Sequence, residues 1–273
     1  MDLKSTILVV GGSACSFKLL NTLIRFLPTP ESARKKSWRW RNISTSLAHS
    51  SLTGAWAVLC FYLQPHMLED LMSSPSLLSH SLVAVSAGYF IQDFFDVALN
   101  ESLKRSWEVL LHHSAVMNFT LCFCVSLLTF RLFVGFSVMS LLVEINSVFL
   151  HVRQLLLLSA PRPSVAYRVT SWLNLGTLLV FRVGTMAWMS RWLAAHSQRM
   201  SRYVLLLGTV SLSAISTMNM VLFYRLLRAD ILTSSPGTSN GEETRKREKI
   251  REREMNIQAY IFIYTQYSLK IVT

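Results

Sequence analysis

The sequence contains few charged residues for its length, and this shortage excludes an ordinary soluble domain. Asp, Glu, Lys and Arg together make up 15% of the 273 residues, whereas a soluble globular domain carries about 25%. Apolar residues make up 51% of the chain, and the charges cluster between long apolar runs. This distribution is typical of a polytopic membrane protein, because each spanning helix needs about 20 mostly apolar residues.

Cysteine is also scarce, and its placement argues against a disulfide framework. The four cysteines, Cys15, Cys60, Cys122 and Cys124, all lie within apolar runs. Cys122 and Cys124 are two residues apart, so a helix would point them to different sides. We therefore expect buried thiols that form neither disulfides nor a metal site.

The histidines are too scattered for a metal centre of the di-iron type. Such membrane enzymes need several histidine clusters, and this chain has one adjacent pair, His112 and His113, among seven histidines. The spacing of Asp93 and Asp96 is too common to identify a magnesium site. We expect no metal and no resident cofactor.

Seven apolar runs predict an all-α polytopic membrane protein with about seven transmembrane helices. The first run carries Gly11, Gly12 and Lys18, and is compatible either with a bundle helix or with a signal anchor. The predicted helices span 3–24, 43–64, 77–99, 109–130, 132–152, 171–193 and 203–227.

Basic residues outnumber acidic ones, 27 to 15, and they gather in alternate connections. The first, third and fifth connections and the tail are basic, whereas the connection at 65–76 has neither Lys nor Arg. The positive-inside rule then places the N-terminus outside and the C-terminus in the cytoplasm. The connection with Arg191, Arg199 and Arg202 is an exception. We expect the basic face to contact anionic lipids of the cytoplasmic leaflet, and we expect no nucleic-acid binding.

Several ionisable residues interrupt the apolar runs near their predicted cytoplasmic ends. Each costs roughly 2.5–3.5 kcal/mol on insertion unless it faces a polar partner. Their similar depth on four helices predicts a single polar layer inside the bundle. Its members are His49, Asp93, Asp96, His112, His113, Glu144 and His151.

Spacing within this layer predicts shared helix faces. The two aspartates are three residues apart, and Glu144, Ser147 and His151 recur along one stripe of a helix. Arg182 lies midway along the sixth run, at a depth similar to that of Glu144. A buried arginine needs a partner, so we expect an ion pair between Arg182 and Glu144.

The layer contains groups suited to acyl transfer. A histidine accepts a proton near neutral pH, and a carboxylate can orient it. His112, His113 and Glu144 are therefore candidate catalytic residues that could activate a hydroxyl or an amine, and the other polar residues would line a lipid site. Alternatively, the same side chains hold the helices together through hydrogen bonds, each worth about 0.6–2 kcal/mol.

Several stretches resemble the TLC domain, the membrane domain shared by ceramide synthases and translocating-chain-associated membrane proteins. The resemblance implies a six-helix bundle with a lipid-accessible internal cavity at 32–227. An N-terminal helix and linker, 1–31, would precede it, and a basic tail, 228–273, which the composition predicts to be disordered, would follow. The matching stretches are LPTPESARKKSWRWRN, SLAHSSLTG, VSAGYFIQDFFD, WEVLLHHSAV, VGFSVMSLLVEINSVFLHVRQLLLLS and VTSW.

The resemblance also bears on chemistry. In ceramide synthases a histidine pair and two aspartates are required for acyl transfer from acyl-CoA. His112 and His113 match the pair, but the aspartate positions fall on Glu144 and Ser147, so one carboxylate is retained as Glu and the other is lost. This departure speaks against sphingoid N-acylation.

Within the family, the chain is most similar to the TLC domain-containing protein 1/2 subgroup. That resemblance implies a multi-pass plasma-membrane protein that limits polyunsaturated acyl chains in phospholipids, especially phosphatidylethanolamine, and so regulates membrane fluidity. Three hypotheses remain open: a regulator that binds lipid, a lipid acyltransferase with acyl-CoA as substrate, and a non-catalytic partner of a channel or translocation complex. The basic third and fifth connections could hold CoA phosphates in the second case.

Overall fold

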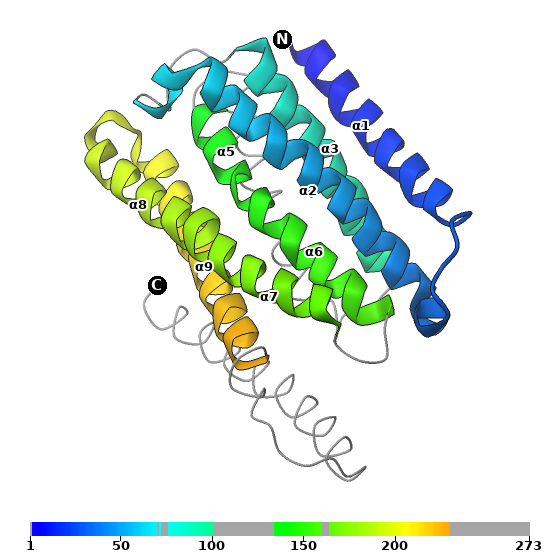
Figure 1. The fold of residues 1–273 in the computed structure, drawn as a ribbon. Coiled ribbons are helices and arrows are strands. Elements are labelled where there is room, and N and C mark those ends of the chain that lie inside the picture. Colours follow the sequence, from blue (N-terminus) through cyan, green and yellow to red (C-terminus); the bar gives the residue numbers. More distant parts are fainter. Residues whose placement is uncertain (1, 70, 72–75, 101–133, 160–163, 230–273) are drawn as a thin grey trace, which may run out of the picture. The chain divides into compact units, whose positions relative to one another are not determined.

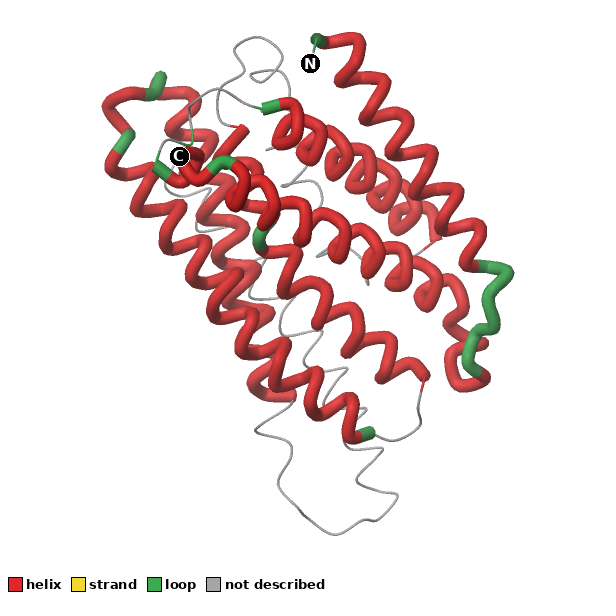
Figure 2. Tube along the Cα trace, turned by 45° about the horizontal axis from the view of Figure 1, so that its top comes forward, coloured by secondary structure: helices red, strands yellow, loops and turns green. Residues whose placement is uncertain are grey.

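The structure is a computed structural model that describes residues 2–69, 71, 76–100, 134–159 and 164–229. In these residues the chain forms helices and short connections, without a β-strand (Figures 1 and 2). The predicted helix at 109–130, the pair His112 and His113, and the tail beyond Ala229 lie outside the described residues. The all-α class predicted from the apolar runs is confirmed.

The long helices run back and forth along the bundle (Figure 1). The α-helices are α1 (Leu3–Ile24), α2 (Ser37–Leu63), α3 (Leu77–Asn100), α5 (Val134–Leu141), α6 (Val143–Ser159), α7 (Val165–Leu178), α8 (Thr185–Ala195) and α9 (Arg202–Leu227). The remaining turns are η1 (Glu31–Lys36), η2 (Pro65–Leu68) and η4 (Ser197–Arg199), which are 3₁₀ helices, and η3 (Leu179–Gly184), which is a π-helical segment.

Local signals explain where several helices begin. The side chains of Asp2, Ser164 and Ser201 accept hydrogen bonds from backbone amides three residues ahead, which caps the starts of α1, α7 and α9. Pro28 and Pro30 follow the end of α1, where a proline disfavours further helix. Such local signals explain why the predicted bounds of α1 and α9 agree closely with the structure.

The first helix belongs to the bundle, because α1 packs along α3 (Figure 1). The Ser13 hydroxyl donates to the Val85 carbonyl oxygen over 2.7 Å, and Thr6 Oγ1 lies 3.0 Å from His80 Nε2. The two backbones come closest at Gly88, where an added Cβ would lie 2.3 Å from the Val10 carbonyl oxygen. A glycine is therefore required at this crossing.

Helix α2 lies between α3 and α6 (Figures 1 and 2). One stripe of α2 is almost fully buried, at Thr45, His49, Thr53, Ala57 and Cys60. The stripe follows the helical period of three and four residues, and its first half is polar. Helix α2 is therefore the element from which polar side chains reach both neighbouring helices.

Two predicted single helices are interrupted in the structure. The run at 132–152 forms α5 and α6, with a break at Leu142, and the helical region continues to Ser159. The run at 171–193 begins at Val165 and passes through the π segment η3 before α8. Apolar periodicity does not reveal these interruptions, because each one lies inside a continuous apolar run.

Within the described residues, four helical stretches are long and apolar enough to cross a membrane: α1, α3, the stretch Val134–Ser159 and α9. The chain is accordingly a multi-pass membrane protein. The first connection reaches the end of α6, since the Ser32 hydroxyl donates to the Leu158 carbonyl oxygen over 2.8 Å. The basic first connection and the C-terminal end of α6 thus lie at the same end of the bundle.

Candidate functional site

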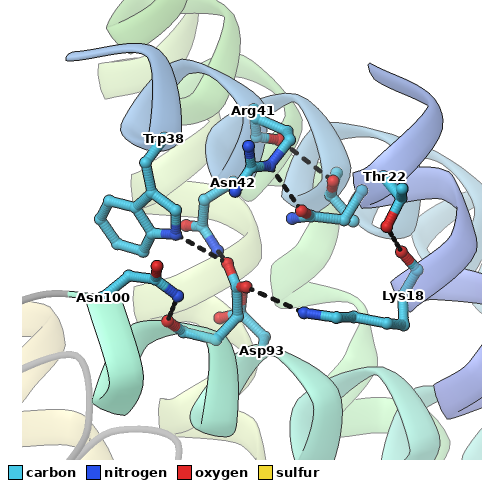
Figure 3. Close-up of polar contacts among 10 residues, drawn as sticks. Lys18, Thr22, Trp38, Arg41, Asn42, Asp93 and Asn100 are labelled. Atoms are coloured by element: carbon cyan, nitrogen blue, oxygen red, sulfur yellow. Dashed lines mark hydrogen bonds and ion pairs between the residues drawn. The ribbon is translucent and has the colours of Figure 1, made fainter. Parts of the chain in front are cut away.

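A cluster of polar side chains, here the carboxylate cluster, joins the ends of α1, α2 and α3 (Figure 3). Its members are Lys18, Trp38, Asn42, Asp93 and Asp96. The Asn42 amide donates to Asp93 Oδ1 over 2.7 Å and to Asp96 Oδ2 over 3.4 Å. The prediction that the two aspartates share one helix face is confirmed, because a single amide contacts both.

Asp96 receives the remaining donors of this cluster. Trp38 Nε1 donates to Asp96 Oδ2 over 3.0 Å, and Lys18 Nζ lies 3.4 Å from Asp96 Oδ1 (Figure 3). The Lys18 side chain is 60% exposed, whereas that of Asp96 is 2% exposed. Asp96 is therefore stabilised mainly by the half-buried donors Trp38 and Asn42, with the lysine at the surface.

About two turns further along α2, three aromatic rings from α1 and α3 surround His49. The His49 ring stacks on Tyr89, with centroids 3.7 Å apart and planes at 13°. Phe17 and Phe90 present their edges to the histidine ring at 5.6 and 5.2 Å. The Tyr89 hydroxyl donates to Ser46 Oγ over 2.9 Å, so polar side chains of α2 continue from Asn42 in the carboxylate cluster toward the bundle interior.

Glu144 lies on the other side of α2, at the start of α6. The Ser50 hydroxyl donates to Glu144 Oε2 over 2.6 Å, and both residues are buried. Close packing of α2 on α6 permits this contact, because an added Cβ at Gly54 would lie 3.2 Å from the Ile145 nitrogen. The Glu144 carboxylate is thus held toward α2.

A second cluster, here the arginine cluster, joins α6, α7, η3 and α9. Arg182 donates from Nε to Asn146 Oδ1 over 2.6 Å, from Nη1 to Asn219 Oδ1 over 2.8 Å and from Nη2 to Ser147 Oγ over 2.8 Å. Asn146 Nδ2 in turn donates to Asn174 Oδ1 over 2.9 Å. All five side chains of the cluster are buried.

The predicted ion pair between Arg182 and Glu144 is wrong. In the described part of the chain, no carboxylate lies within 4 Å of the Arg182 guanidinium. Ser147 and Asn146 accept hydrogen bonds from the guanidinium, while the Glu144 carboxylate accepts one from Ser50 on α2. Glu144 and Ser147 therefore share one stripe of α6 but contact different neighbours, Ser50 on α2 and Arg182 in η3.

The remaining predicted site residues are placed as follows. His151 is half-buried on α6, about two turns beyond Glu144. His112 and His113 lie outside the described residues, so their proximity to Glu144 stays a prediction. Among the residues that the structure describes, no three His, Cys, Asp or Glu side chains gather as metal ligands would.

Sequence reasoning missed the neutral partners of these clusters. Asn42, Ser46 and Ser50 recur at intervals of four along α2, a signal that a search for polar stripes would have found. Asn146 and Asn219 offer no comparable signal, because a single amide in an apolar run stands out less than a charge does.

Together, the helices and buried polar clusters define a polytopic membrane protein whose bundle interior is hydrogen-bonded from one neighbouring helix to the next. Comparison with known sequences identifies its family. Residues 39–228 match the TLC domain, and this chain belongs to the TLC domain family. Membership of this family indicates a membrane lipid-related role.

Curated relatives agree with this assignment. The chain is 48% identical over 255 residues to TLC domain-containing protein 2 of Danio rerio, covering 93% of this chain and 100% of the relative. It is 41% identical to the Homo sapiens protein of the same name, covering 88% and 92%. TLC domain-containing protein 1 of Homo sapiens is 34% identical, covering 80% and 87%. The similarity to the first relative extends beyond the domain match itself.

Proposed function

We propose that this protein regulates the phospholipid composition of the plasma membrane and thereby its fluidity. It would limit polyunsaturated acyl chains in phospholipids, phosphatidylethanolamine above all, by binding a lipid or acyl chain within the helix bundle. Similarity to TLC domain-containing proteins 1 and 2 over most of the chain supports this proposal. His112, His113 and Glu144 would lie near the lipid head group.

The observation that carries the proposal is the buried polar path along α2. It leads from Asp93 and Asp96 at one end of the bundle, past His49, to Glu144 on α6. Such groups are expensive in a bilayer unless they face one another or a polar guest. A lipid whose head group enters from that end would meet hydrogen-bonding groups while its chain contacts apolar side chains.

The orientation predicted from the basic connections places that end of the bundle in the cytoplasm, because the basic first connection lies there. An acyl donor such as acyl-CoA would reach the same end. An acyltransferase is therefore the second candidate. The arrangement that favours it is the 2.6 Å hydrogen bond that fixes the Glu144 carboxylate, because a fixed carboxylate can orient a histidine base.

The test is a phospholipid profile of cells that express the wild type or the His112→Ala/His113→Ala double variant at matched surface levels. His66→Ala is the matched control, because His66 is exposed in η2, a turn that joins α2 to α3. We expect the wild type and His66→Ala to lower the polyunsaturated fraction equally, and the double variant to do so less.

The three hypotheses predict different profiles. Complete loss in the double variant, with loss also in His112→Gln/His113→Gln, favours acyl transfer, because glutamine cannot act as the base. Partial retention in the glutamine variant favours lipid binding. An equal shift by the wild type and the alanine variant would exclude any role of the histidine pair. Absence of a shift in the wild type would contradict the proposed function itself.

A further inference from the structure

The positive charge of Arg182 is buried among neutral partners. The residue is 6% exposed, and its three hydrogen bonds go to two amide oxygens and one hydroxyl. Glu144 attracts the guanidinium from beyond 4 Å, and its carboxylate is held by Ser50. A desolvated guanidinium without a direct counter-ion is costly, so this position calls for a further negative group.

The arginine cluster also has more donors than acceptors. A guanidinium carries five N–H donors and no acceptor, and three of them are used. The Nδ2 groups of Asn174 and Asn219 are buried and have no hydrogen-bond partner among the residues that the structure describes. The amide orientations follow from the arginine, which can only donate. Asn219 and Asn146 must therefore turn their oxygens to Arg182. Asn146 then donates from its nitrogen to the Asn174 oxygen, which leaves the Asn174 nitrogen pointing the other way.

Unused donors of this kind select the chemistry of a ligand. In a membrane-spanning bundle, no bulk water satisfies them, so their complement is an acceptor-rich group of negative charge. Arg182 lies within η3, and π-helical turns inside helices occur frequently at functional sites. From this segment Arg182 donates to the Asn219 amide oxygen on α9.

We propose that the arginine cluster binds the oxyanion of an acyl lipid. The oxyanion is either the carboxylate of a fatty acid or the phosphate of a phospholipid, held by Arg182 with the free amide groups of Asn219 and Asn174. This inference rests on the proposed lipid-binding function and adds a recognition site between α6, η3 and α9. The site is separate from Glu144, whose carboxylate points to α2.

The experiment measures thermal unfolding of the purified full-length protein in detergent, with lipid probes at equal mole fraction. Oleate is compared with oleyl alcohol, and dioleoyl phosphatidate with dioleoylglycerol, so that each anion has a neutral partner with the same chains. We expect at least one anion to raise the Tm by several degrees more than its neutral partner. A response to oleate alone identifies a fatty-acid carboxylate, and a response to phosphatidate alone identifies a lipid phosphate.

The decisive variant is Asn219→Asp, which replaces the free NH₂ by a carboxylate oxygen beside Arg182. We expect this variant to fold with a Tm at least equal to that of the wild type, because it supplies the missing counter-ion, and to lose the anion response. Asn21→Asp is the matched control. Asn21 also accepts from an arginine, Arg41 Nε over 2.7 Å, and also has a buried Nδ2 without a partner. This control should retain the response.

Each other outcome overturns the inference. Neither anion exceeding its neutral partner would exclude an oxyanion site, as would an unchanged response in Asn219→Asp. Destabilisation of Asn219→Asp would show that no counter-ion is missing, and loss of the response in Asn21→Asp would place the effect elsewhere. If oleate and oleyl alcohol stabilise the protein equally, and phosphatidate and dioleoylglycerol do too, the proposed lipid binding is supported and the oxyanion site at Arg182 is excluded. If no probe stabilises it, the proposed lipid binding itself is contradicted.

Discussion

At the residue scale, the decisive feature is how neutral side chains hold buried charges. Asp93 and Asp96 share one amide, and Arg182 is surrounded by amides and a hydroxyl. Asp93, Asp96 and Arg182 were predicted from the sequence as members of a polar layer, because an ionisable residue stands out in an apolar run, whereas Lys18 was not. Their partners were not, because which amide meets which charge depends on how α2, α6 and α9 pack.

Asn42→Leu should destabilise the protein markedly. The change removes the donor to both carboxylates of the carboxylate cluster and leaves two buried acceptors with fewer partners. We expect a loss of about 1–3 kcal/mol in the free energy of unfolding, measured by thermal or denaturant unfolding in detergent. Ser44→Ala, two residues further along α2, is the control, because its hydroxyl donates only to the Trp40 carbonyl oxygen of its own helix.

A different result follows for Lys18→Met. The lysine is 60% exposed, and exposed ion pairs contribute about 0–1 kcal/mol. Asp96 keeps its bonds from Trp38 and Asn42 in this variant. We therefore expect a loss below about 1 kcal/mol in the same unfolding assay. A loss as large as that of Asn42→Leu would mean that the lysine is the main stabilising partner of Asp96.

At the element scale, the sequence located the helices better than their interruptions. The predicted first helix has the bounds of α1, where Asp2 caps the start and Pro28 follows the end. The π segment η3 and the break at Leu142 were not foreseen. Both depend on contacts between helices: η3 carries Arg182 to Asn219, and α6 begins where Glu144 meets Ser50.

Gly88 offers a test of the crossing between α1 and α3. An added Cβ at Gly88 would lie 2.3 Å from the Val10 carbonyl oxygen and 2.7 Å from the Ser13 Cβ. Gly88→Ala must therefore separate the two helices, and overpacking of this kind costs about 1–3 kcal/mol. We expect a lower Tm and faster proteolysis of the α1 segment.

Gly12→Ala is the matched control for this crossing, since its added Cβ would meet nothing within 4 Å. Alanine is favoured over glycine inside a helix by about 0.5–1 kcal/mol, so the control should be neutral or slightly stabilising. Equal effects of the two substitutions would contradict the close approach of α1 and α3.

At the scale of the whole molecule, the alternating basic connections and the bundle of antiparallel helices predict one orientation. Helix α2 has 27 residues, a length of about 40 Å, which exceeds the roughly 30 Å hydrocarbon thickness of a bilayer. Although α2 is less apolar than the four stretches named above, we expect its two ends to lie on opposite sides of the membrane. Lys36 precedes α2 within the basic first connection, and His66 follows it in a connection that has neither Lys nor Arg.

Cysteine labelling of these two exposed positions measures the orientation directly. We expect a membrane-impermeant maleimide to label His66→Cys in intact cells, and to label Lys36→Cys only after permeabilisation, each above the level of the wild type with its four native cysteines. The reverse pattern would invert the orientation and move the carboxylate cluster to the outer side, away from acyl-CoA. Labelling of both positions in intact cells would mean that α2 does not span the bilayer. Either result would exclude acyl transfer from a cytoplasmic donor at this end of the bundle, whereas the oxyanion site at Arg182 could still be reached by lipid.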